Sequence, residues 1–213
     1  MPNITGPALS FPAKSFPTQQ AGAPMASLGE LGMGALVGRY GTLVKAGKVF
    51  YTSAIVTSPV TFSTAGQLGP ILWNKPGSNI DAFILGISVG SPTVATSVSG
   101  GIGWASNVQS TQPTATNTAI TAVNAYAGGG VSQLALVATN SGGAVGVLPV
   151  AIFLPMVGVN TGAITTQVLG TSGYVDVAGM LAIGPGNVGY VCANSTLTSG
   201  VFTLGVMWAE LAV

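Results

Sequence analysis

The segment Gly86-Ile87-Ser88-Val89-Gly90 matches G-x-S-x-G, the pattern of the nucleophile elbow in α/β-hydrolases. In that motif the serine needs a base, normally histidine, and an acid that orients the base. This chain contains no histidine, no helix-like segment follows Gly90, and nothing marks any of the four lysines as a base. We therefore interpret Ser88 as a strand residue that faces inward or toward a neighbouring strand.

Other groups with catalytic or metal-binding chemistry are scarce. Metal sites need clustered histidine, cysteine or carboxylate ligands. The chain has one cysteine, Cys192, whose apolar surroundings in the sequence indicate a buried structural thiol. Its four acids are scattered: Glu30, Asp81, Asp176 and Glu210. Asp176 and Glu210 could meet in space as a hydrolytic pair, but we interpret each as an acid at a strand end. We expect a non-enzymatic protein with no metal and no cofactor.

Charged residues are rare in this chain. Only 4% of the residues are Asp, Glu, Lys or Arg, against about 25% in ordinary soluble domains. The formal net charge of +1 gives no electrostatic reason to expect nucleic-acid binding. No formal charge occurs between Asp81 and Asp176, and unpaired charge is costly at a dry interface. The composition indicates a neutral polar surface, burial against other subunits, or both, and we expect a homo-oligomer.

The sequence does not indicate a membrane protein or a secreted one. The longest apolar segment, Ala144–Val159, is short for a membrane-spanning helix and contains Pro149 and Pro155. The N-terminal sequence MPNITGPALSF lacks the basic region and the apolar core of a secretory signal. We expect no membrane partner and no signal peptide.

Residues 1–36 differ from the rest of the chain because prolines recur among small and polar residues, at positions 2, 7, 12, 17 and 24. This spacing prevents a continuous helix and removes strand donors. We expect an extended arm that lies along a neighbouring surface, or a disordered tail. Its candidate contact residues are the apolar side chains of Ile4, Leu9, Phe11 and Phe16. Just after the arm, Arg39, Lys45 and Lys48 fall close together, which is more typical of a solvated loop than of a phosphate site.

Residues 37–213 have the pattern of one all-β domain. The stretch Ile71–Gly90 predicts a strand, a turn and a second strand, arranged as a hairpin or as a corner. In the final strand, Gly200–Glu210, alternation places Phe202, Leu204, Val206 and Trp208 on the core face, beside Phe83 and Leu85. The other expected strands are Val49–Thr57, Val60–Thr64, Ala119–Tyr126, Val131–Thr139, Val145–Leu154, Ile164–Leu169, Tyr174–Val177, Met180–Ile183 and Val188–Ala193.

Two connections are also interpreted from the sequence. The Ser/Thr/Gly-rich segment after Gly90, which contains Trp104, predicts loops with one or two short strands. The turn-forming residues 140–143 predict a hairpin between the strands that flank them. With frequent turns and no helical period, we expect an antiparallel two-sheet sandwich, as a jelly roll, with an extended N-terminal arm.

Three features together resemble a known family: Leu72-Trp73-Asn74-Lys75-Pro76-Gly77-Ser78, the turn Gly184-Pro185-Gly186, and the terminal Met207-Trp208-Ala209-Glu210. Over about residues 45–213 the chain resembles small virion structural proteins of tailed bacteriophages, which form jelly-roll trimers on the capsid as cement or decoration proteins. The resemblance implies a homotrimer on the capsid surface of the virion, made in the host cytoplasm. It would bind the major capsid protein between capsid subunits, with no catalysis and no cofactor. The arm residues, together with Arg39, Lys45 and Lys48, are then candidate contacts with the capsid or a neighbouring subunit.

Two other classes of function stay open. The chain could form a trimeric fibre or spike domain that binds a receptor, although the sequence has neither repeats nor a helical stalk. It could also be a carbohydrate-binding module, for which Trp73, Trp104 and Trp208 are few and dispersed as aromatic platforms.

Overall fold

The computed structural model describes residues 40–57, 69–94, 98–113, 120–137, 152–161, 172–194 and 200–213. The chain divides into two units, Met1–Ala46 and Gly47–Val213. In the first unit, the described residues hold one short helix, α3 (Gly41–Lys45). The predicted arm over residues 1–36 and its boundary at Val37 lie outside the described residues. No helix in the described parts of the chain is long and apolar enough to cross a membrane.

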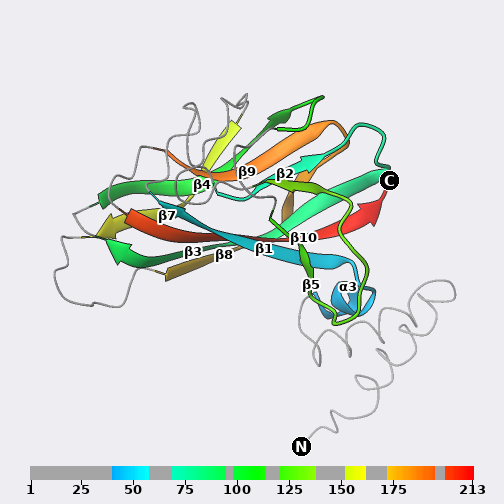
Figure 1. The fold of residues 1–213 in the computed structure, drawn as a ribbon, viewed down its shortest axis with the longest axis horizontal. Coiled ribbons are helices and arrows are strands. Elements are labelled where there is room, and N and C mark those ends of the chain that lie inside the picture. Colours follow the sequence, from blue (N-terminus) through cyan, green and yellow to red (C-terminus); the bar gives the residue numbers. More distant parts are fainter. Residues whose placement is uncertain are drawn as a thin grey trace, which may run out of the picture. The chain divides into compact units, whose positions relative to one another are not determined.

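The second unit is a two-layer β-sandwich (Figure 1). One sheet has the strand order β5-β1-β10-β3-β8 and the other the order β6-β2-β9-β4-β7. The strands are β1 (Val49–Thr57), β2 (Ile71–Asn74), β3 (Ile80–Val94), β4 (Val98–Val108), β5 (Val123–Asn124), β6 (Ala135–Val137), β7 (Ile152–Thr161), β8 (Ser172–Ile183), β9 (Asn187–Ala193) and β10 (Gly200–Ala212). Every described pairing is antiparallel, so the predicted all-β, two-sheet antiparallel sandwich is confirmed.

The pairing of the long strands is nested. β1 pairs with β10, β2 with β9, β3 with β8 and β4 with β7. Successive pairs alternate between the two sheets, as if one long hairpin had been wound around a barrel axis. This winding is the arrangement of a jelly roll. β5 and β6 are short additions from the connection between β4 and β7, and they extend one edge of each sheet.

Two predictions about connections are wrong. The segment interpreted as loops contains β4, an eleven-residue strand, and Trp104 on it is buried. The serines and glycines of β4 give it a low strand propensity, but its pairing with both β7 and β9 stabilises it as a strand. The described parts of the predicted 140–143 hairpin do not pair, because β6 lies beside β2 and β7 beside β4, at opposite edges of one sheet. The expected strands Val60–Thr64 and Ile164–Leu169 lie outside the described residues.

The core lies between the sheets, and the side chains of β1 and β10 alternate between the core and the outer side. In β1, Phe50, Thr52, Ala54 and Val56 are buried while Tyr51, Ser53 and Ile55 are exposed. In β10, Phe202, Leu204, Val206 and Trp208 are buried as expected, and the Trp208 ring stacks on Phe50 with ring centres 5.9 Å apart. Strands with this alternation have one face on the core and one face in solvent.

One residue expected in the core lies on the other side of its sheet. Phe83 is only partly buried, whereas its neighbours Ala82 and Ile84 are fully buried. The register of β3 against both of its partners shifts near Leu85, which shows a β-bulge there. Beyond the bulge, Ile87 and Val89 face the core. Leu85 is buried as predicted.

The stretch Ile71–Gly90 forms a corner and not a hairpin, because β2 and β3 belong to different sheets. The buried side chain of Asn74 holds the corner. Its Nδ2 donates to the carbonyl oxygens of Ile80 at 2.8 Å and Ile183 at 2.9 Å, and its Oδ1 accepts from the hydroxyl of Ser78. The carbonyl of Asn74 also accepts from the backbone N–H of Gly186 at 2.8 Å. Asn74 therefore joins two turns that lie far apart in the sequence.

Candidate functional site on the outer face of one sheet

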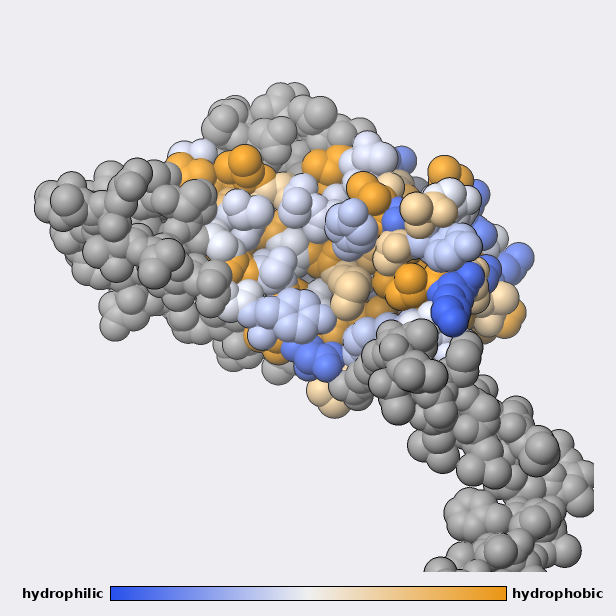
Figure 2. Space-filling view, turned by 90° about the horizontal axis from the view of Figure 1, so that it is seen from below, coloured by the Kyte–Doolittle hydropathy of each residue, from blue (hydrophilic) through white to orange (hydrophobic). Residues whose placement is uncertain are grey.

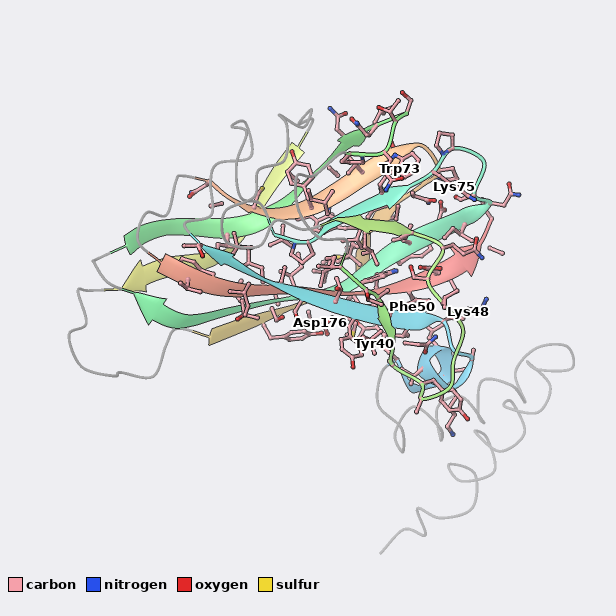
Figure 3. The ribbon with its side chains drawn as sticks, in the orientation of Figure 1. Tyr40, Lys48, Phe50, Trp73, Lys75 and Asp176 are labelled. Atoms are coloured by element: carbon pink, nitrogen blue, oxygen red, sulfur yellow. The ribbon has the colours of Figure 1, made fainter. Side chains whose placement is uncertain are left out.

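The described part of the chain contains only two of the predicted contact residues. Lys45 is exposed in the last turn of α3. Lys48 is exposed just before β1 (Figure 3). They belong to the two separate units. Ile4, Leu9, Phe11, Phe16 and Arg39 lie outside the described residues.

The structure does not assemble the chemistry that the sequence motifs suggested. Ser88 lies in the middle of β3 and is exposed, so it does not face inward, and its Oγ lies over Gly205 of the neighbouring strand β10, as the second predicted alternative has it. Its partners in the sheet are Gly205 on β10 and Tyr174 on β8. Asp176 is exposed on the outside of the sheet, whereas Glu210 is buried on the inside, so these two acids do not form a pair. Among the described residues, no three metal-binding side chains come together.

The feature with the strongest functional character is the outer side of the sheet β5-β1-β10-β3-β8, in the part that lies beyond the β3 bulge and contains Gly86 to Gly90. We call this part the outer face. The central strand β9 of the other sheet is not exposed in this way, because its residues from Val188 to Ala193 are buried on both sides of the sheet. The outer face is formed by Val123, Tyr51, Ser53, Ile55, Thr203, Gly205, Met207, Gly86, Ser88, Gly90, Tyr174 and Asp176. Asp176 is the single charged residue in this set. Figure 2 views the molecule from this side and shows pale and hydrophobic residues across its middle.

The part of the outer face over β5 and β1 is apolar, and we call it the apolar strip. Val123, Tyr51 and Ile55 form it, with side chains that are 45%, 47% and 56% exposed, and the small uncharged Ser53 lies between Tyr51 and Ile55. Val123 pairs directly with Tyr51 across the strands. Large apolar side chains exposed side by side, without a charge between them, are typical of a surface that contacts another protein.

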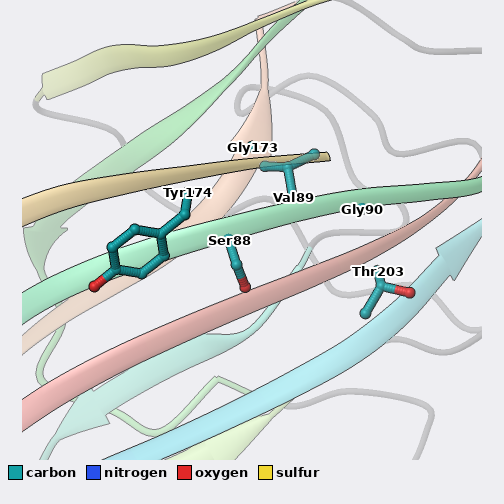
Figure 4. A pocket seen from close by; sticks show the side chains of 6 residues that line it. All are labelled: Ser88, Val89, Gly90, Gly173, Tyr174 and Thr203. Carbon is teal, nitrogen blue, oxygen red and sulfur yellow. The ribbon is translucent and has the colours of Figure 1, made fainter. Parts of the chain in front are cut away.

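The part of the outer face over β3 and β8 is hollowed. The hollow has a volume of about 370 Å³ and is lined by Ser88, Val89, Gly90, Gly173, Tyr174 and Thr203 (Figure 4). The Tyr174 side chain lies across Gly86, where a Cβ atom would overlap its ring and hydroxyl. Ser88 Oγ likewise lies over Gly205. The glycines therefore let side chains from the neighbouring strands lie close to the sheet.

Tyr174 keeps its proton over a wide range of pH. Burial and the negative charge of the nearby Asp176 both raise the pKa of the Tyr174 phenol above its ordinary value. At neutral pH the phenol is therefore a neutral hydrogen-bond donor and acceptor.

The three tryptophans, which were the candidate aromatic platforms in the sequence, lie away from the outer face. Trp104 and Trp208 are buried in the core. Trp73 is partly buried, and its Nε1 donates to the carbonyl of Gln109 at 2.8 Å. The exposed aromatic residues of the outer face are Tyr51 and Tyr174. Alternation along β1 separates the two faces of the strand without saying which one is exposed, and no local signal distinguishes Tyr174.

Comparisons with known proteins do not assign this chain to a family. No family model matches it, and neither a curated protein nor a solved structure matches it.

Proposed function

We propose that this chain is a non-enzymatic structural protein of a virus particle. In this proposal it forms a homotrimer, binds the major capsid protein between capsid subunits, and stabilises the shell as a cement or decoration protein. The observation that carries the proposal is the outer face, a group of neighbouring residues on one sheet of the sandwich among which Asp176 is the single charged residue.

The apolar strip supports self-association. Burying a charged side chain at an interface costs free energy unless the charge is paired, and Tyr51, Ile55 and Val123 present no charge. Two copies of the same neutral surface can meet without like-charge repulsion. Closed symmetric assemblies are the usual outcome of such contacts, and the resemblance to capsid decoration proteins favours a trimer.

The N-terminal sequence supports attachment to a second protein. Residues 1–36 contain five prolines and only two charges, Lys14 and Glu30. A chain of this composition cannot offset its own ordering entropy by burial, so contacts with a neighbour must order it. Proline reduces that cost because it restricts the free chain. In the proposal, Ile4, Leu9, Phe11 and Phe16 contact the capsid or a neighbouring subunit, and Arg39, Lys45 and Lys48 add basic contacts beside the arm.

The oligomeric state tests self-association. Light scattering from the full chain at micromolar concentration should give about three times the chain mass of 21.0 kDa. The double variant Tyr51→Lys, Ile55→Lys should dissociate, because it introduces charge into the apolar strip. The matched control is Val108→Lys, a charge at an exposed valine of the other sheet. A monomeric wild-type chain, or equal dissociation by the control, would contradict the proposal.

Attachment is tested with capsids that were assembled without this protein. The full chain should bind them, and a chain that lacks residues 1–36 should remain folded by circular dichroism but bind more weakly. Full-strength binding by the shortened chain would move attachment to the sandwich and contradict the role of the arm. If antibodies against the protein label particle tails and not heads, the fibre or spike function is correct and the capsid role is wrong.

A further inference from the structure

We propose that the hollow over β3 and β8 is a binding site for a neutral sugar ring, as part of an oligosaccharide. The hollow belongs to the outer face but uses different residues from the apolar strip, so its test is separate from the test of self-association. It rests on three properties of the hollow, which are an exposed aromatic ring, a set of neutral hydroxyl groups and an open glycine floor.

The aromatic ring is that of Tyr174, which is 57% exposed. A sugar ring has one or two faces made of C–H groups, and these pack on exposed aromatic rings. Tyrosine suits such a contact because it combines an apolar ring with a polar hydroxyl group. The ring lies across Gly86, because a glycine at this position leaves room that any Cβ would fill. Gly86 therefore sets the position of the platform.

The hydroxyl groups come from three neighbouring strands. Ser88 on β3, Thr203 on β10 and Tyr174 on β8 line the same hollow (Figure 4). Each hydroxyl donates one hydrogen bond and accepts others, which matches the hydroxyl groups of a sugar. Interactions of this kind set orientation and specificity in small-ligand sites.

The charge around the hollow selects for a neutral ligand. None of the lining residues is charged. The carboxylate of Asp176 lies near enough to raise the pKa of Tyr174, so the charge beside the hollow is negative. An anionic ligand would be repelled by that carboxylate and would find no cation among the lining residues. A neutral polyhydroxyl compound meets neither obstacle.

The floor of the hollow leaves space for a ring. Gly90 and Gly173 contribute no side chain, and a Cβ built on Gly90 would meet no atom closer than Thr203 Cβ at 3.8 Å. The volume of about 370 Å³ lies within the range of small-molecule sites, which is roughly 300–1,000 Å³. Because the hollow is open to solvent, it can hold one ring of a longer chain.

The space above Gly90 provides a selective variant. Gly90→Val should fill the hollow without a clash against the protein, whereas Tyr174→Ala removes the platform. The matched control is Tyr126→Ala, because Tyr126 is 50% exposed and lies outside the hollow, in the connection after β5. Circular dichroism and thermal unfolding of each variant confirm that it is folded.

The experiment uses the full chain on an array of neutral oligosaccharides built from glucose, galactose, mannose and N-acetylhexosamines, with sialylated and sulfated glycans on the same array. The strongest neutral glycan is then titrated by calorimetry. We expect binding to at least one neutral glycan, weakened at least tenfold by Gly90→Val and by Tyr174→Ala, and unchanged by Tyr126→Ala.

Three outcomes would overturn the proposal: no neutral glycan binds, only the anionic glycans bind, or both hollow variants bind like the wild-type chain. The oligomeric state of each variant is measured in parallel. Loss of glycan binding in a variant that keeps the wild-type oligomeric state supports the hollow and leaves self-association untouched.

Discussion

The indole Nε1–H of Trp208 donates a 3.0 Å hydrogen bond to the carboxylate of Glu210, two residues further along β10. Both side chains are buried, because residues two apart in a strand share one face of the sheet. The same carboxylate accepts hydrogen bonds from the hydroxyl of Ser132 and from the backbone N–H of Gln133 at 3.0 Å. One acid on the last strand therefore holds the connection between β5 and β6 in place.

Replacing this acid should loosen that connection. Glu210→Gln keeps the shape of the side chain but leaves one acceptor oxygen for three donors, so at least one donor becomes unsatisfied. We expect the free energy of unfolding to fall by about 1–3 kcal/mol, and hydrogen exchange to accelerate at the Gln133 amide and the Trp208 indole. Urea unfolding and NMR measure both effects. Asp176→Asn is the control, since this exposed acid accepts a bond from Ala178 N–H that an amide oxygen can also accept; an equal loss there would contradict the interpretation.

Asn74 is expected to be among the polar side chains that stability depends on most. Asn74→Ala would leave the buried carbonyl oxygens of Ile80 and Ile183 without this donor. Each such group costs about 1–3 kcal/mol, so we expect a loss of about 3 kcal/mol in urea unfolding. Asn107→Ala should change stability far less, because its side chain accepts an exposed local bond from Val108 N–H. Equal effects of the two variants would show that the corner is not held by Asn74.

The buried side chains on the core face of β10 should contribute strongly to stability. Phe202 is fully buried, so Phe202→Ala should cost about 3–5 kcal/mol, as for other buried aromatic residues. Tyr126→Ala, at a half-exposed tyrosine, should cost much less. Chemical denaturation gives both values, and a loss below about 1 kcal/mol for Phe202→Ala would mean that its side chain is not in the core.

Substitution by alanine should destabilise the protein at one glycine and have almost no effect at another. A Cβ on Gly189 would overlap the ring of Trp104 and lie 2.9 Å from Ile183 Cδ1, and both of these side chains are buried and cannot move away. We expect Gly189→Ala to cost about 1–3 kcal/mol or more through overpacking. Gly90→Ala should be nearly neutral, because its Cβ would have only ordinary contacts. Thermal unfolding compares the two, and similar melting temperatures would contradict the close packing of Trp104 on β9.

Cys192 should be inert while the protein is folded. Burial raises the pKa of its thiol to about 12, and the thiolate is the reactive form. A thiol reagent at pH 8 should therefore react slowly with the folded chain and rapidly with one thiol per chain in urea. Rapid reaction of the folded chain would show that the thiol is accessible.

The same shift makes stability depend on pH in the alkaline range. Below the ordinary thiol pKa of 9.0, Cys192 is protonated in both states and its titration leaves stability unchanged. Between pH 9.0 and about 12 the unfolded chain releases this proton while the folded chain retains it, so this group lowers the free energy of unfolding as pH rises.

The sequence by itself determined the fold class and much of the core. Alternation along β10 is a local pattern, and it correctly placed Phe202, Leu204, Val206 and Trp208 on the core face. The turn residues at 74–79 and 184–187 were also recognisable, because the backbone conformations of Gly77 and Gly186 at positive φ favour glycine wherever they occur. The composition, with no histidine and few charges, argued against a serine nucleophile with a histidine base and against a metal site.

Only the tertiary structure decided which distant residues meet. β4 is a strand because β7 and β9 pair with it, although its own sequence is rich in small residues. Glu210 and Asp176 lie on opposite sides of one sheet, since each inherits its orientation from the register of its strand. Tyr174 lies over Gly86 because β8 pairs with β3 beyond the bulge at Leu85. No local sequence pattern predicts the position of that bulge. Contacts of this kind depend on strand pairing across the whole chain, so they cannot be deduced from neighbours in the sequence.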